Sequence, residues 1–168
     1  MKKFLVCISA ILIICILFAC GSNHENFEKP VNFYYRTAAV TYNNEQAVIA
    51  AEVRDGAALD QDLNNILMQY LTGPVSDEFI SPFPAGVTVE SLQIDAQHVR
   101  IILSKPFDTL SGIQLTLACT CLSNTVMELA DCQSVEISVA DALLDGKESI
   151  IIDRQAILLM DQKPLSEG

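Results

Sequence analysis

Side chains that could do chemistry are few in this sequence and do not gather into a recognisable site. Its two histidines, His24 and His98, are far apart, and a lone histidine in a turn is more often a solvated polar residue than a base or a metal ligand. Asp55, Asp60 and Asp62 are close together, but their spacing fits a turn and a helix start better than calcium binding. No nucleophile-elbow, zinc-protease, phosphate-loop or EF-hand motif is present. We therefore predict neither a catalytic residue nor a bound metal or cofactor.

The cysteines of the main part of the chain are Cys119, Cys121 and Cys132. Cys119 and Cys121 are two residues apart, so on a helix their side chains point in different directions. The C-x-C spacing is therefore not a zinc pattern. An odd number of thiols allows at most one disulfide. Buried free thiols that pack as small hydrophobic side chains are the favoured interpretation. A bridge from Cys132 to Cys121 or to Cys119 stays open as an alternative.

The N-terminal segment is the most informative part of the chain. Two lysines precede an apolar run over residues 4–19 that contains no charge, and Cys20 follows directly. This is the pattern of a secretory signal peptide over residues 1–19, and its ending resembles a bacterial lipobox, although Phe18 stands where a small residue is usual. We predict cleavage after Ala19 and lipidation of Cys20 by a diacylglyceryl group with palmitate among its acyl chains.

An uncleaved membrane helix is the alternative for this segment. The apolar run is short for a bilayer core, which needs about 20 apolar residues, and no basic stop-transfer cluster follows it. Both interpretations place everything after Cys20 outside the cytoplasmic membrane. The lipid anchor would hold it at the outer leaflet.

The remaining chain divides into a lipidated cysteine and polar tether over residues 20–32, one domain over residues 33–160 and a tail over residues 161–168. The formal net charge is −11, and removal of Lys2 and Lys3 with the signal peptide makes it −13. An acidic domain is not expected to bind nucleic acid, because phosphate contacts need basic side chains. An anionic leaflet would also repel it, so the lipid alone would hold it at the membrane.

Hydrophobic periodicity predicts an α+β domain. Strands are expected at residues 31–36, 47–53, 87–94 (with a bulge), 99–103, 135–139 and 149–152 (with an irregular end over 156–159). Helices are expected at residues 59–71 and from residue 109 or 111 to residue 129. The order ββαββαββ predicts a two-layer sandwich with two helices packed on one face of a mixed sheet. Asp60 and Asp62 would lie in the first turn of the first helix, and Gly73-Pro74 would end it.

Two regions of the surface have no predicted packing partner in this arrangement. Three prolines keep residues 75–86 irregular, and this loop could border a ligand pocket. On the sheet, Ile49, Ile102 and Ile151 would point away from the helices and leave an apolar face.

Four motifs follow one another along the domain: residues 67–74 (LMQYLTGP), 84–87 (PAGV), 94–104 (IDAQHVRIILS, with Phe107 beyond it) and 135–139 (VEISV). Together they resemble the Germane, or GerMN-type, domain family, over about residues 31–156. The resemblance implies a role in sporulation, germination or assembly of the envelope of spore-forming Gram-positive bacteria. It also implies a fold like that of ring-building modules and no catalytic residues. The founding member carries two copies of the domain, and this chain has room for one.

Three functions follow from these observations. We favour a non-catalytic interaction domain, held at the membrane by its lipid, that docks another envelope protein. A lipoprotein that binds a small solute or a peptide is the alternative, which requires a pocket with converging polar groups. An envelope hydrolase is the third, and it requires a cleft that brings His98 against a serine or a cysteine. The oligomeric state is not predicted.

Overall fold

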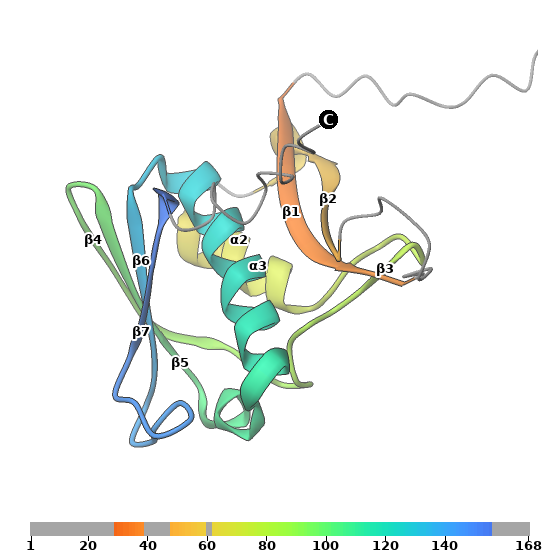
Figure 1. Ribbon diagram of the computed structural model, residues 1–168. Helices are drawn as coiled ribbons and strands as arrows, with labels where there is room; N and C mark the ends of the chain where they lie inside the picture. Colours follow the sequence, from red (N-terminus) through yellow and green to blue (C-terminus); the bar gives the residue numbers. More distant parts are fainter. Residues whose placement is uncertain (1–28, 39–47, 60–61, 156–168) are drawn as a thin grey trace, which may run out of the picture.

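The computed structural model describes residues 29–38, 48–59 and 62–155 of the 168 (Figure 1). In chain order the elements are β1 (Pro30–Thr37), β2 (Ile49–Asp55), α2 (Leu63–Leu71), β3 (Phe79–Ile80), β4 (Val89–Asp95), β5 (His98–Leu103), α3 (Gly112–Ala130), β6 (Ser134–Val139) and β7 (Ile150–Asp153), with 3-10 turns at Gly56–Ala58 and Lys105–Thr109. The predicted α+β class and the predicted order of the main elements are confirmed. Within the described residues, no helix is long and apolar enough to cross a membrane.

The strands form two sheets, where the sequence predicts one. A three-stranded sheet has the order β2-β1-β3, and a four-stranded mixed sheet has the order β4-β5-β6-β7. Figure 1 shows α3 between them, and α3 contacts β1 on one side and β6 and β7 on the other. Strand pairing joins residues far apart in the chain, so alternation within each strand does not reveal which sheet the strand joins.

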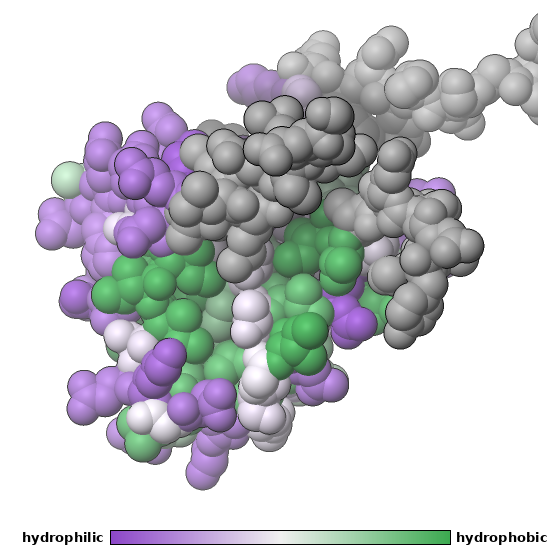
Figure 2. Space-filling model, in the orientation of Figure 1, coloured by the Kyte–Doolittle hydropathy of each residue, from purple (hydrophilic) through white to green (hydrophobic). Residues whose placement is uncertain are grey.

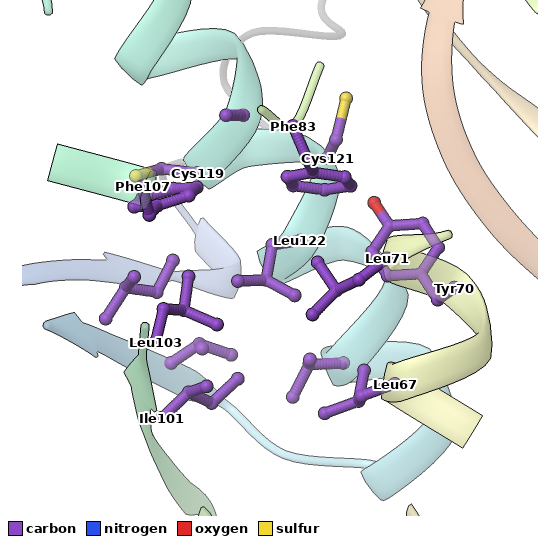
Figure 3. Close-up of a cluster of buried hydrophobic side chains, with 14 of the residues drawn as sticks. Leu67, Tyr70, Leu71, Phe83, Ile101, Leu103, Phe107, Cys119, Cys121 and Leu122 are labelled. Carbon is purple, nitrogen blue, oxygen red and sulfur yellow. The ribbon is translucent and has the colours of Figure 1, made fainter. Parts of the chain in front are cut away.

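The centre of the four-stranded sheet follows the predicted alternation. Val99, Ile101 and Leu103 of β5 are fully buried, and β5 pairs antiparallel with β4 and parallel with β6. The predicted bulge lies in β4, where the register shifts between Val89 and Ser91. Figure 3 shows where the layers meet: Leu122 of α3 packs between β5 residues and Leu67 and Leu71 of α2, deep in the buried core.

The first helix begins later than predicted. The Asp62 carboxylate accepts a hydrogen bond from the Asn64 N–H at 2.8 Å, so Asp62 caps α2 from outside and does not lie within its first turn. Asp60 lies outside the described residues. The end of the helix is as predicted, because Gly73 takes a φ of +109°, which a glycine adopts without strain. The loop after it is not wholly irregular, since β3 pairs with β1.

Three predicted segments lie outside the described residues: the signal peptide with Ala19 and Cys20, most of the tether, and the tail over residues 161–168. The same holds for His24 and residues 156–159. β1 begins at Pro30, so it takes up the last three residues of the predicted tether.

The three isoleucines that were predicted to form an apolar face do not form one continuous surface. Ile49 packs against the core, and Ile102 is half-buried between Ser91 and Ser138 on neighbouring strands. Ile151 is 58% exposed.

Candidate functional site

An apolar groove of about 330 Å³ runs between α3 and β7. The register of the sheet builds it: Ile150 and Ile152 pair with Ile137 and Val135 of β6, so they share the face that is directed at α3. Leu115 and Cys119 line the groove from the helix. Figure 2 shows this apolar surface over β7, beside a paler strip that follows α3. Such a groove suits apolar side chains of a partner.

β7 is also the last strand of its sheet. Within the described residues it pairs with β6 alone, so one of its edges carries unpaired backbone N–H and C=O groups. Ile151 projects from the opposite face of the strand and is exposed. The groove and the open edge together can accept an extended segment of another chain.

A smaller pocket of about 200 Å³ lies beside the proline-rich loop, as the sequence predicts for that loop. Phe83 and its two neighbouring prolines form one wall, and Arg36 of β1 and Gln114 of α3 add polar groups. Neither Arg36 nor Gln114 is among the site residues predicted from the sequence. The signal in the sequence that could have indicated Arg36 is its position, as a basic residue at the end of the apolar strand predicted at residues 31–36.

His98 lies against a serine on the outward face of the four-stranded sheet. Its Nδ1 is 2.7 Å from Ser134 Oγ, and its Nε2 is 3.4 Å from Glu136 Oε2. All three residues lie on the sheet face that points away from α3, and neither of the two pockets above includes them. Glu136 also accepts a hydrogen bond from Arg100 at 2.8 Å, which is the main reason why the pKa of its carboxyl is lowered. Among the described residues this is a network on the outward face of the sheet, outside both pockets described above.

A buried ion pair joins β2 to the loop after α2, and sequence reasoning missed it. Arg54 Nε donates to Glu52 Oε2 at 2.7 Å, and Arg54 Nη2 donates to the Gly73 carbonyl at 2.9 Å. The other oxygen of Glu52 accepts from the N–H groups of Val75 and Ser76 at 2.8 and 2.7 Å. The sequence does contain a signal for this ion pair, because two opposite charges that are two residues apart on a strand lie on the same face. The cluster holds the chain in place and points to no reaction.

The three thiols are free and buried, which confirms the burial expected from the sequence. Burial raises the pKa of Cys119 to about 12 and that of Cys121 to about 12, although the positive charge of Arg36 partly opposes the shift at Cys121. Burial also raises the pKa of Cys132. Thiols that stay protonated are poor nucleophiles and poor metal ligands. Among the described residues, no group of three or more His, Cys, Asp or Glu side chains is placed to hold a metal ion.

We expect the three thiols to react with a maleimide at least about 100-fold more slowly in the folded protein than in urea. At pH 8, a pKa near 12 leaves only about 1 thiol in 10,000 as the reactive thiolate. Labelling followed by mass spectrometry of the peptides measures each site. An Asp95→Cys variant, at the exposed end of β4, provides a thiol that should react quickly. Rapid native labelling of Cys119 or Cys121 would contradict the buried environment described above.

The fold and the comparisons together define the class of protein. A family model named Germane, described as "Sporulation and spore germination", matches residues 32–145. The match spans more than half of the chain, and the chain belongs to the Germane family. This is not a known catalytic family, and its description links the domain to sporulation and germination.

Solved structures show the same fold. The first GerMN domain of the sporulation protein GerM from Bacillus subtilis is 15% identical with a TM-score of 0.54, over 74% of this chain and 95% of that one. The tandem GerMN domains of the same protein are 19% identical with a TM-score of 0.53, over 77% of this chain. The chain spans about half the length of that tandem structure, 46%. At these identities the likeness shows the fold alone. A sequence comparison with curated proteins gives no match.

Proposed function

We propose that this protein is an extracytoplasmic lipoprotein whose GerMN-type domain is a non-catalytic docking module for another envelope protein. The observation that carries the proposal is the open edge of β7 beside the apolar groove. The occupant is an extended segment of the partner that adds a strand to β7 and places alternate apolar side chains in the groove. The family's description supports a setting in sporulation or germination.

The charge around β7 narrows the chemistry of the occupant. Asp145, Glu148 and Asp153 lie beside or at the end of the strand and are exposed. Lys147 and Arg154 offset part of their charge, so the surroundings of β7 are acidic by one charge, in a chain with a formal net charge of −11. Basic residues on either side of the partner's apolar segment would therefore be attracted to this edge. The partner is thus an apolar strand with basic flanks.

The anchor in this proposal is a lipid on Cys20, which lies outside the described residues. Residues 20–29 precede β1, and at full stretch ten residues reach about 35 Å. The domain would then work close to the outer leaflet of the cytoplasmic membrane, where an envelope partner is within reach.

A photo-crosslinker at position 151 tests the docking edge. We expect benzophenone-alanine in place of Ile151 to give one dominant adduct in native membranes, with the partner peptide mapping to an apolar segment that has basic flanks. Position 94 in β4 is the matched control, because Ile94 is 56% exposed, close to the 58% of Ile151, and β4 is the opposite edge of the same sheet. We expect at least about ten-fold less of this adduct from position 94. The same adducts from both positions, or none from position 151, would remove the proposal.

A further inference from the structure

Among the residues that the structure describes, no carboxylate pairs with Arg36. It lies near the end of β1, the central strand of the three-stranded sheet, between Ile49 of β2 and Ile80 of β3. Its Nε is buried and has no hydrogen-bond acceptor among the residues that the structure describes. A buried donor without an acceptor is costly, and native proteins rarely leave one unless another molecule supplies the acceptor.

The other arginines show what is unusual about this one. Arg54 pairs with Glu52, Arg100 with Glu136 and Arg154 with Asp131, at 2.6, 2.8 and 3.7 Å. In the described part of the chain, Arg36 alone of the four arginines has no carboxylate within such a distance. In a chain with a formal net charge of −11, acidic side chains are plentiful, and none of the described ones is placed here.

Arg36 lines a shallow pocket that is partly open to solvent. Pro82, Phe83, Pro84 and Leu110 give the 200 Å³ cavity an apolar lining, and the Gln114 side chain adds an amide. Phe83 is only 8% exposed and is fixed by an edge-on ring contact with Tyr70 at 5.1 Å between centroids. The pocket wall is therefore rigid. Its volume of about 200 Å³ corresponds to about seven water molecules at about 30 Å³ each, which suits a ligand fragment of amino-acid size.

We propose that this pocket binds a carboxylate carried on a small aliphatic group, with Arg36 as the anion-binding residue. A guanidinium can donate two parallel hydrogen bonds to one carboxylate. In one of the two possible arrangements, the Nε–H group is one of the two donors. The Gln114 amide can donate to the same anion. The apolar lining accepts the aliphatic group. α3 begins between Leu110 and Gln114, and its partial positive charge adds to the attraction without being a site by itself.

The chemistry fits two sources of ligand, a free short-chain carboxylic acid or the C-terminal residue of a peptide. Either ligand would be small, so we expect a dissociation constant on the order of 1 mM for a minimal probe. The pocket shares no lining residue with the groove beside β7, although both border the start of α3. The proposal for Arg36 does not rest on the docking proposed for β7.

Nuclear magnetic resonance of the full mature chain in detergent micelles tests the site directly. The chain has four arginines, so at most four Nε–H signals are expected. We expect N-acetyl-leucine to shift the Arg36 Nε–H signal and the Gln114 side-chain amide signals saturably. N-acetyl-leucinamide, which lacks the carboxylate, should shift them less than about one-tenth as much. Isovalerate separates the sources: affinity equal to that of N-acetyl-leucine indicates a free acid, and at least about ten-fold weaker binding indicates a peptide terminus.

Substitutions complete the experiment. Arg36→Gln should weaken N-acetyl-leucine binding at least about ten-fold, whereas Arg100→Gln on the surface of the other sheet should leave it unchanged. The Nε–H shift in the unmodified chain gives a result even if Arg36→Gln fails to fold. The proposal is overturned if the Arg36 signal shows no saturable shift up to 20 mM of either carboxylate probe, or if the amide analogue has the same effect.

Discussion

With Arg54 replaced by methionine, we expect the free energy of unfolding to fall by about 3 kcal/mol. The Arg54 and Glu52 side chains are only 17% and 8% exposed, so solvent screens the pair weakly. The substitution keeps an unbranched stem of similar length but removes the charge, which leaves the Glu52 carboxylate buried without its cation. The Gly73 carbonyl also loses a donor, and the Phe33 ring loses a guanidinium 4.7 Å from its centroid. Urea unfolding followed by circular dichroism measures the change.

Arg100→Met is the matched control for this prediction. Arg100 also donates to a carboxylate, Glu136, at 2.8 Å, but its side chain is 49% exposed. Exposed ion pairs contribute little, so the control should lose less than about 1 kcal/mol. Glu52→Gln should fall between the two, because an amide oxygen can still accept from the backbone N–H groups of Val75 and Ser76. Equal losses for Arg54→Met and Arg100→Met would show that the buried cluster contributes no more than a surface pair.

The parts of the fold that depend on local pattern could be predicted from the sequence. Val99, Ile101 and Leu103 are buried and alternate with positions that are not fully buried, and this period of two identifies a half-buried strand wherever its partner lies. The end of α2 at Gly73-Pro74 likewise depends on neighbouring residues alone. The predicted start of α2 is wrong, because the apolar period of the helix extends back to Leu59. The helix itself begins after Asp62, whose carboxylate caps its N-terminus.

The arrangement of α3 could not be predicted, because it depends on contacts distant in the chain. The sequence shows one apolar stripe along this helix, which includes Leu115 and Leu122. In the structure Ser123 and Thr125 are also buried. Thr125 Oγ1 accepts a hydrogen bond from the Tyr34 N–H of β1 at 3.0 Å, whereas Ser123 Oγ has no hydrogen-bond partner among the described residues. A helix between two sheets buries two faces, and a polar group on its second face, such as that of Thr125, can find its partner on the other sheet.

The candidate sites also combine features that depend on local sequence with features that depend on distant contacts. The proline-rich loop indicated a pocket, because prolines keep a segment out of sheets and so leave it free to form a wall. Arg36 could not be placed there from the sequence, because its strand and α3 are far apart in the chain. The groove beside β7 requires the pairing of Ile150 with Ile137, which is again a distant contact.

Replacing Cys20 with alanine should remove the protein from washed membranes or stop its maturation, while the domain stays folded. Each buried methylene of an acyl chain contributes about 0.8 kcal/mol, so two long chains hold a protein durably and their loss leaves little affinity. The domain itself cannot compensate, since its net negative charge is repelled by anionic lipid. Fractionation of cells, with detection of the domain in membrane and soluble fractions, measures the change. Mass spectrometry of the mature N-terminal peptide should find a diacylglyceryl group on Cys20 in the unmodified protein.

Ser22→Ala is the control for this prediction, because it changes a neighbouring polar residue and leaves the lipid acceptor intact. It should remain in the membrane fraction. If the Cys20→Ala protein also remains there after washing with high salt, then the apolar run over residues 4–19 holds it as an uncleaved helix. A helix of this kind would still place the domain outside the membrane, but it would carry the intact leader. The two anchors therefore differ in the mass of the membrane-bound chain, and the measured mass decides between them.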